Sequence, residues 1–318
     1  MAINDFKPSY VWPNAAFHFR LYYRSDKCRI FIIENITHNW VWLSKYADKI
    51  RQSDYFFVQL GWYFGDWLTE ECSRAINALG LEKSKFRIMF PDYSTKNLFE
   101  YYGFQGCLVN HNCFLDENKF KIISVDKVYD AIYVARFSPF KRHMLASNVK
   151  NLALVAGDAW GPESKEIPPH VYLNDKQLSS EEVNIKLSQS KVGLLLSEFE
   201  GACYSSSEYL LSGLPVVSTW SHGGRSIWYN DYNSITCDAN PESVAESVYK
   251  LIREGRDRQK IRDMHIAQSK GMRLNFIAMH QQVLRECSDN GDASIYFQNN
   301  FIHKMLKSEN PDFDEIFC

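Results

Sequence analysis

Residues 194–219, LLLSEFEGACYSSSEYLLSGLPVVST, join two apolar runs through a loop of small residues and hydroxyls. The run KVGLLLS (191–197) predicts a buried strand, and PVVST (215–219) predicts a second. Between them, Ser205 and Glu208 have the S-x-x-E spacing of a capping box, which predicts the start of a short helix. The order strand, loop, helix, strand indicates a parallel α/β unit.

The loop EFEGACYSS (198–206) lies where such a unit binds ligands. In open parallel sheets the ligand site is outside the carboxyl ends of the strands, where the next helix begins and its backbone N–H groups can receive a phosphate. Gly201 and Ala202 allow close approach to the backbone. Glu200 and Glu208 bracket the loop. A position in a solvated loop would also explain Glu200, and a capping box would also explain Glu208. The local sequence therefore leaves open whether these glutamates bind a ligand or have a structural role.

The same alternation of strands and helices runs through the whole chain. Besides 191–197 and 215–219, the runs typical of strands are 28–33, 55–60, 86–90, 106–110, 130–135, 152–157, 170–173 and 234–238. Apolar strands between helices imply parallel sheets covered on both faces. A length of 318 residues is long for one core and favours two domains.

Two further segments help to place the domains. The polar, non-periodic segment NHNCFLDENKFK (110–121) suits a linker. Asn240 is a candidate N-cap with Pro241 at the first helical position, and the chain is helical from there on.

Composition excludes several classes of function. Lys plus Arg number 36 and Asp plus Glu 38, so no global field attracts nucleic acid, and no nucleic-acid partner is expected. The eight cysteines include no C-x-x-C pair and no metal-ligand spacing, so we expect free thiols in a reducing cytosol. The start MAINDFKPSYVW lacks signal-peptide features, and no apolar run approaches the roughly 20 residues that span a bilayer. A cytoplasmic protein, peripheral to the inner membrane at most, is expected.

The central stretch resembles a known family. SEFEGACYSSSEYLLSGLPVVST (197–219) is similar to the E-x7-E segment of family 4 glycosyltransferases, S-x-x-E-G-F-G-x-x-x-x-E-A-x-A-x-G-x-P-V-V. The residues in register are Ser197, Glu200, Gly201, Glu208, Gly213, Pro215, Val216 and Val217. VARFSPFKRH (134–143) resembles the family's G-R-L-x-x-x-K-G, residues 221–248 resemble G-G-x-x-E and the helix after it, and 109–120 resemble P-N-G-V-D-x-x-x-F. Together the matches run from about residue 86 to 255.

The resemblance implies an α/β GT-B architecture with two Rossmann-like domains facing across a cleft. The expected division is a short acceptor-side domain with linker at 1–124, a nucleotide-sugar-binding domain at 125–272, and helices at 273–318 that can cross back to the first domain. The implied activity is retaining transfer of a hexose from a nucleoside diphosphate-sugar to a glycan or lipid-linked saccharide, in bacterial surface polysaccharide synthesis. Two alternatives stay open: a non-catalytic partner subunit, and a sugar-nucleotide epimerase or phosphorylase on the same fold.

The resemblance also assigns roles to residues. It places Arg136 and Lys141 on the diphosphate, Glu200 beside the donor sugar, and Glu208 on the two ribose hydroxyls. Carboxylates suit diols, which offer two donors to an acceptor-only group. Charged hydrogen bonds contribute about 1.5–3 kcal/mol each and a helix N-terminus about 0.3–1, so the cations should carry most of the diphosphate charge. The residues expected to present backbone N–H groups are Ala202, Cys203, Tyr204 and Ser205, beside Gly201.

The chain departs from the family pattern at several positions. The glutamate after G-G is missing, and Arg225 and Ser226 stand there. Tyr204 and Ser205 replace aliphatic residues, and Tyr209 replaces alanine. These departures leave the identity of the donor open.

Three further features are weaker. His38 and Asp66 follow predicted strands and are acceptor-side candidates, although a structural or surface role explains each at least as well. The DFD motif (312–314) mimics a D-x-D metal site but lies beside a proline after the last expected helix, where a solvated tail is expected. No metal and no other cofactor is therefore expected. His222, in the loop before Arg225, receives no chemical role.

Overall fold

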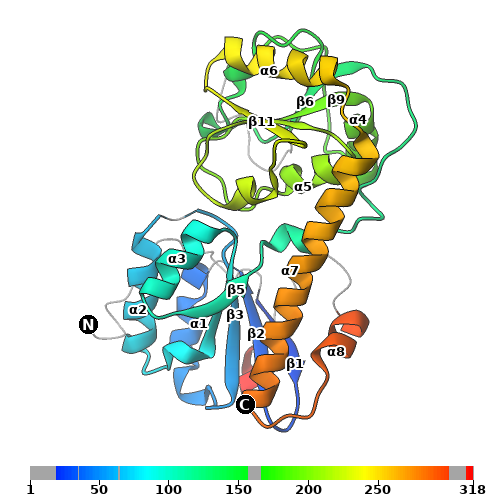
Figure 1. Ribbon diagram of the computed structural model, residues 1–318. Coiled ribbons are helices and arrows are strands. Elements are labelled where there is room, and N and C mark those ends of the chain that lie inside the picture. The colour runs from blue at the N-terminus through cyan, green and yellow to red at the C-terminus, as the bar shows by residue number, and fades with distance from the viewer. Residues whose placement is uncertain (1–18, 35, 64, 157–165, 301–312, 318) are drawn as a thin grey trace. The chain divides into compact units, whose positions relative to one another are not determined.

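The computed structural model describes residues 19–34, 36–63, 65–156, 166–300 and 313–317. The chain forms two compact units: unit 1 comprises residues 1–114 and 271–318, and unit 2 comprises residues 115–270. The boundary between residues 270 and 271 falls inside helix α7 (Arg258–Glu286), so this helix contributes to both units (Figure 1). The C-terminal helices after it are assigned to unit 1.

Unit 1 contains a five-stranded sheet in the order β1-β2-β3-β4-β5. Its strands are β1 (Phe19–Arg24), β2 (Arg29–Glu34), β3 (Asp54–Gln59), β4 (Phe86–Phe90) and β5 (Gln105–Leu108). Strands β2 to β5 are parallel, whereas β1 pairs antiparallel with β2 through a tight turn that closes with a 2.9 Å bond from Ser25 N to Cys28 O. The sequence did not predict β1; every strand that it did predict overlaps an observed one.

Helices cover both faces of this sheet. One face packs against α1 (Trp40–Lys45), α2 (Trp67–Ala78) and α3 (Tyr93–Tyr101) through a core rich in phenylalanine. The other face meets α7, where Phe57 of β3 contacts Phe276 edge to face with ring centroids 5.8 Å apart. Helix α8 (Ala293–Asn300) lies on the same side, where Tyr296 contacts Tyr22 of β1. Short 3-10 turns complete the unit: η2 (Ile36–His38), η3 (Ala47–Lys49), η4 (Lys83–Lys85) and η5 (His111–Phe114).

The expectation of a solvated C-terminal tail is wrong. Residues Phe313–Phe317 form a short helix, α9, and Phe317 is buried in the core of unit 1, stacked on Phe31 and Tyr46. Asp314 accepts a 2.6 Å hydrogen bond from the Tyr46 hydroxyl. The tail is held because its aromatic ring finds an aromatic pocket that the local sequence does not reveal. Asp312 and the N-terminal segment 1–18 lie outside the described residues.

Unit 2 contains a fully parallel six-stranded sheet in the order β11-β10-β9-β6-β7-β8. The strands are β6 (Tyr129–Val134), β7 (Leu152–Val155), β8 (Tyr172–Leu173), β9 (Ser190–Leu195), β10 (Val216–Thr219) and β11 (Ser234–Cys237). The helices are α4 (Ser180–Ser188), α5 (Tyr204–Leu211) and α6 (Pro241–Glu254), with 3-10 turns η6 (Pro139–Lys141), η7 (His143–Ala146) and η8 (Gly224–Trp228). The prediction for α6 is confirmed, because the Asn240 side chain caps it by accepting from Ser243 N at 2.8 Å. In the described part of the chain, none of the helices is both long and apolar enough to span a bilayer.

Candidate functional site

Three loops of unit 2 follow the carboxyl ends of neighbouring parallel strands. Strand β6 leads into residues 135–141, β9 into residues 196–203, and β10 into residues 220–225. Strand β7 continues the sheet on one side of β6 and β9 continues it on the other, so the order reverses between β6 and β9. Doubly wound sheets bind their ligands at such a switch point.

Lys141 and Glu200, predicted from two separate motifs, meet in this place. The Lys141 ammonium forms an ion pair with Glu200 Oε2, and the two side chains are only 12% and 7% exposed. The Tyr133 hydroxyl positions the lysine loop by donating a 2.7 Å hydrogen bond to the Lys141 carbonyl oxygen. The structure thus brings Lys141, the residue expected to bind the diphosphate, into direct contact with Glu200, the residue expected to bind the donor sugar.

Arg225 and Ser197 form a chain of hydrogen bonds that ends at the Glu200 carboxylate. Ser197 Oγ donates to Glu200 Oε2 at 2.8 Å, and Arg225 Nη1 donates to Ser197 Oγ. Arg225 Nη2 also donates to the Thr219 carbonyl oxygen at 2.7 Å and to Ser218 Oγ at 3.2 Å. The Arg225 side chain is fully buried, and among the described residues its hydrogen bonds go only to uncharged oxygens. Within the described part of the chain, its charge is therefore buried without a carboxylate partner.

The two carboxylate oxygens of Glu200 have different surroundings. Oε2 accepts from both Lys141 and Ser197. Within the described part of the chain, no donor reaches Oε1. One oxygen is fixed by the protein, and the other can accept from a ligand hydroxyl.

Arg136 and Lys141 share one aromatic ring. The guanidinium of Arg136 and the ammonium of Lys141 each lie 5.2 Å from the centre of the Phe140 ring. An aromatic face attracts cations, and here it places two of them on one short loop. Both members of the R-x4-K pair thus lie against the same ring.

The start of α5 differs from the sequence prediction. The helix begins at Tyr204 after Cys203, which has a positive φ of 54° and makes no side-chain cap. The predicted capping box is wrong: Ser205 already lies inside the first turn, and its hydroxyl donates to the Val134 carbonyl oxygen of β6 at 3.0 Å. Glu208 lies in the body of α5 and is 9% exposed. The first N–H groups of α5 lack a side-chain cap, which suits an anion site.

Tyr209 has a structural explanation. Its hydroxyl accepts from Val134 N at 2.8 Å and donates to the Leu194 carbonyl oxygen at 3.3 Å, so it bridges the carboxyl ends of β6 and β9. Its ring lies over Gly193, where an added Cβ would be only 2.3 Å from a ring carbon. Glycine at 193 and tyrosine at 209 therefore form a complementary pair at the switch point.

Arg142 is a positioning residue that the sequence did not reveal. It has a left-handed backbone with φ 51°, at the position where the resembling motif has glycine. Its guanidinium donates to the Leu196 carbonyl oxygen at 2.7 Å and to Thr219 Oγ1 at 2.8 Å, joining the ends of β9 and β10. The only signal in the sequence is a basic residue at a glycine position.

The acceptor-side candidates lie at the carboxyl ends of two neighbouring strands of unit 1. His38 ends η2 after β2, and its side chain is outside the described residues. Asp66 precedes α2 in the loop after β3; it is exposed, and its side chain does not cap the helix. Their roles stay predictions.

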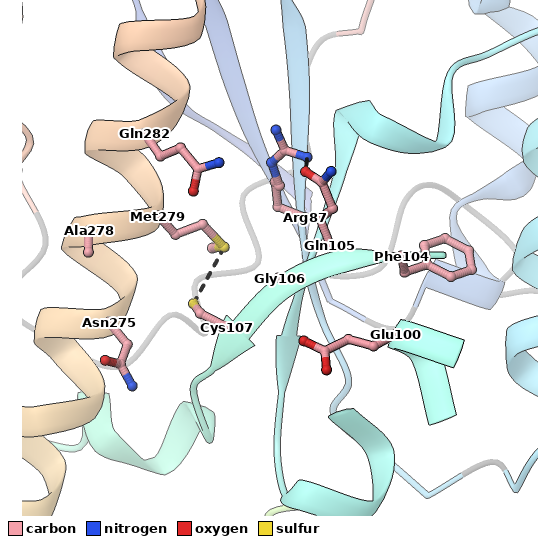
Figure 2. Close-up of a pocket in the computed structure, with 10 residues that line it drawn as sticks. All are labelled: Arg87, Glu100, Phe104, Gln105, Gly106, Cys107, Asn275, Ala278, Met279 and Gln282. Atoms are coloured by element: carbon pink, nitrogen blue, oxygen red, sulfur yellow. Dashed lines mark hydrogen bonds between the residues drawn. The ribbon is translucent and has the colours of Figure 1, made fainter. Parts of the chain in front are cut away.

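A separate pocket of about 440 Å³ lies in unit 1 between β5, α3 and α7 (Figure 2). Its lining residues are Arg87, Glu100, Phe104, Gln105, Gly106, Cys107, Asn275, Ala278, Met279 and Gln282. Figure 2 shows Cys107 and Met279 pointing toward each other, with their sulfur atoms 3.5 Å apart. Arg87 is bound by both carboxylate oxygens of Glu286, at 2.6 and 2.8 Å, and by Gln105. The pocket lies beside the edge strand β5 and away from a switch point in strand order, so we do not assign the diphosphate to it.

Comparisons with known proteins agree on the fold. No protein-family model matches the chain, and no curated protein matches its sequence. Anabaena Alr3699/HepE, solved in complex with UDP, matches 81% of this chain and 78% of its own, with TM-score 0.56 and 14% identity. Sucrose-phosphate synthase from Thermosynechococcus elongatus matches 80% of this chain and 74% of its own, with TM-score 0.55 and 11% identity. The N-terminal domain of Candida albicans trehalose-6-phosphate phosphatase matches 80% and 70%, with TM-score 0.57 and 10% identity.

Similarity at this level of identity identifies the architecture. Four of the five strands in the sheet of unit 1 are parallel, the sheet of unit 2 is fully parallel, and the matches span both units of the chain. The chain therefore has the α/β GT-B fold, with two Rossmann-like units, that is found in glycosyltransferases.

Proposed function

We propose that the chain is a glycosyltransferase that moves a sugar from a nucleoside diphosphate-sugar to a saccharide acceptor. The observation that carries the proposal is the meeting of Lys141 and Glu200 at the switch point of unit 2, with Glu200 Oε1 open to a ligand. A nucleotide sugar needs cations for its diphosphate and a carboxylate for its sugar hydroxyls. Both are present here, from adjacent loops.

The ion pair suggests how the donor binds. Without ligand, the charge of Lys141 is balanced by Glu200. An entering diphosphate can take over the ammonium, which releases one contact of Glu200 while Ser197 keeps the carboxylate in place. Glu200 can then accept from hydroxyls of the donor sugar. Arg136, on the same aromatic ring as Lys141, adds a second cation for the diphosphate.

The same groups would act in the reaction. As the bond from the anomeric carbon to the diphosphate breaks, negative charge grows on the leaving oxygen. Arg136, Lys141 and the start of α5 are placed to stabilise it. Glu200 would orient the pyranose ring, and Glu208 would bind the ribose hydroxyls. We propose retention of the anomeric configuration and transfer of a hexose.

The donor and acceptor are proposed by class. The Anabaena neighbour was solved with UDP and with UDP-glucose, so uridine donors are the first to test. The acceptor proposed is a glycan or lipid-linked saccharide of bacterial surface polysaccharide synthesis, used in the cytoplasm or at the inner membrane. We further propose that the protein cations replace a metal ion. Activity should then survive excess EDTA, and a requirement for manganese would contradict this step.

Calorimetry with UDP tests the diphosphate site. The double variant Arg136→Ala/Lys141→Ala loses two charge-assisted contacts of about 1.5–3 kcal/mol each, so UDP affinity should fall by about 100-fold or more. Uridine affinity should change much less. The matched control is Lys250→Ala/Arg253→Ala on α6, which removes the same charge from exposed positions. Unchanged UDP affinity in the first variant would show that the diphosphate site lies elsewhere.

Turnover separates this proposal from its alternatives. Release of UDP from UDP-glucose, stimulated by an acceptor, indicates a transferase. UDP binding without any turnover indicates a non-catalytic subunit. The same fold is present in a domain of a phosphatase, so the fold alone does not determine the activity. Phosphate-dependent turnover or an epimerised product would identify a phosphorylase or an epimerase.

A further inference from the structure

The pocket of about 440 Å³ in unit 1, here called the β5 pocket, takes no part in the donor site described above. All of its lining residues belong to unit 1, so its shape is set within one compact body. Its volume falls in the range of about 300–1,000 Å³ that is typical of ligand pockets. On α7, Asn275, Ala278 and Gln282 are exposed, so a ligand can enter from solvent.

Helix α7 supplies one wall of the β5 pocket. Asn275, Ala278, Met279 and Gln282 are three or four residues apart along the chain, which places them on one face of the helix. Figure 2 shows Ala278 and Met279 between the two amide side chains. The seven residues from Asn275 to Gln282 rise about 10 Å along the helix axis. The wall therefore has an amide at each end and an apolar middle.

A hydrogen-bond network fixes two amides of the pocket. Arg87, which is 4% exposed, donates to Gln105 Oε1 and to both carboxylate oxygens of Glu286. Glu286 Oε1 also accepts from Gln282 Nε2 at 3.0 Å. Among the residues that the structure describes, Gln105 Nε2 and Gln282 Oε1 are left without a protein partner. The network thus leaves one donor and one acceptor for a ligand.

Two more acceptors line the β5 pocket. Asn275 Nδ2 donates to the Leu108 carbonyl oxygen at 3.0 Å, and Glu100 Oε2 accepts from Lys96 at 2.6 Å. In the described part of the chain, Asn275 Oδ1 and Glu100 Oε1 have no protein partner. Leu108 lies on the edge strand β5, so Asn275 also covers a carbonyl that an added peptide strand would use. The lining therefore suits a compact polar ligand better than an extended peptide.

Charge and polarity narrow the class of that ligand. The two charged residues of the lining, Arg87 and Glu100, are bound by Glu286 and Lys96, so positive and negative charges are equal in number. Such a lining favours neither an anion nor a cation. A wholly apolar ligand would leave the amides without hydrogen bonds, which is unfavourable. A sugar hydroxyl both donates and accepts, and a pyranose ring also has C–H groups that can pack on an apolar surface.

We propose that the β5 pocket binds a neutral oligosaccharide. Hydroxyls at one end would bind Gln105 and Gln282, hydroxyls at the other end would bind Asn275, and C–H groups between them would pack on Met279. The wall is longer than one pyranose ring, so the ligand expected is a disaccharide or a longer chain. The site lies in unit 1, and the inference goes beyond the transfer reaction proposed at the switch point of unit 2.

The test blocks the pocket without removing its polar groups. Ala278→Trp places a large ring in the exposed middle of the α7 wall, and Ala267→Trp makes the same change at an exposed position of α7 outside the lining. Saturation-transfer NMR on the full chain measures binding of maltose, cellobiose, lactose and diacetylchitobiose, which are neutral disaccharides. Labelling with 13C in the methionine methyl groups reports the location, with Met279 in the pocket and Met144, 39% exposed in unit 2, as the reference.

At least one of these disaccharides should bind and shift the methyl signal of Met279 but not that of Met144. Ala278→Trp should abolish the binding and the shift, and Ala267→Trp should preserve both. Failure of every disaccharide to shift the Met279 signal, or unchanged binding in Ala278→Trp, would overturn the proposal.

A second variant tests the polar contacts. Asn275→Ala/Gln282→Ala loses two neutral hydrogen bonds to the ligand, so affinity for the disaccharide should fall about tenfold. Unchanged affinity in this variant would show that the amides do not bind the sugar. Calorimetry with UDP keeps the two proposals apart: all of these variants should bind UDP as the wild type does, whereas a wild-type chain that does not bind UDP would count against the proposed function and not against the β5 pocket.

Discussion

Removing the ammonium of Lys141 should destabilise unit 2, although the residue lies on a loop. Its ion pair with Glu200 is largely desolvated, with side chains 12% and 7% exposed. Removal of one partner from a buried pair costs about 3–5 kcal/mol, because the remaining charge is left uncompensated. The hydrogen bond from Ser197 and the positive charge of Arg225 behind it continue to stabilise Glu200, so Lys141→Met should cost about 3 kcal/mol, the lower end of that range. Against a typical domain stability of about 5–15 kcal/mol, this loss is large.

A double-mutant cycle isolates the pair. Glu200→Gln should also cost about 3 kcal/mol, whereas Lys141→Met/Glu200→Gln removes both charges and should cost less than either single change. The expected coupling energy is thus at least about 3 kcal/mol. The matched control is the pair of Lys191 with Asp130 in the same unit, whose side chains are 37% and 11% exposed, so Lys191→Met should cost about 1 kcal/mol or less.

Hydrogen exchange of the amides in β6 and β9, measured at increasing urea, reports the stability of unit 2 separately from that of unit 1. Additive effects of the two single changes, with a coupling below about 0.5 kcal/mol, would refute a desolvated ion pair and with it the binding sequence proposed for the donor.

Three other predictions test the packing of the two units. Gly193→Ala should lower the free energy of unfolding by about 3 kcal/mol, because its Cβ would lie 2.3 Å from the Tyr209 ring. Adding Tyr209→Ala should relieve the clash. Equal melting points for wild type and Gly193→Ala would contradict this packing. Burial lowers the pKa of His143 and of His280 to about 4, below the ordinary 6.5. The unfolded chain therefore binds more protons, and stability should fall between about pH 6.5 and pH 4 by at most about 3 kcal/mol per histidine. Urea unfolding of His280→Phe should show a weaker dependence of stability on acid pH, and an unchanged dependence would exclude this histidine as a cause. Phe317→Ala should destabilise unit 1 by about 3–5 kcal/mol in thermal unfolding, because the ring is buried, whereas a solvated tail would give no change.

Most strands could be predicted because buried parallel strands are continuous apolar runs, as in YFFVQL at the site of β3. The exception, β1, is an antiparallel edge strand, FRLYYR, in which arginines interrupt the apolar residues. The burial of α9 was also missed, since Phe317 packs against residues that are far away in the sequence. Local patterns predict elements, but they do not predict where a short terminal segment finds its partner.

The candidate site shows the same limit. The spacing of Arg136, Lys141 and Glu200 predicted loops that the structure places on adjacent strands. The capping box failed because the Ser205 hydroxyl bonds to Val134, 71 residues earlier, and no local pattern encodes that contact. The sequence did not predict the direction of the Arg225 side chain either, because this direction depends on how the loops after β9 and β10 meet.

Arg225 changes the charge balance behind Glu200. Lys141 and Arg225 contribute two positive charges and Glu200 one negative, so these three buried groups sum to +2 − 1 = +1. An uncharged residue at position 225 would make the same sum zero. A buried net charge is unfavourable until an opposite charge binds. Arg225 therefore increases the preference of this site for an anionic ligand, which is the property that a diphosphate donor requires.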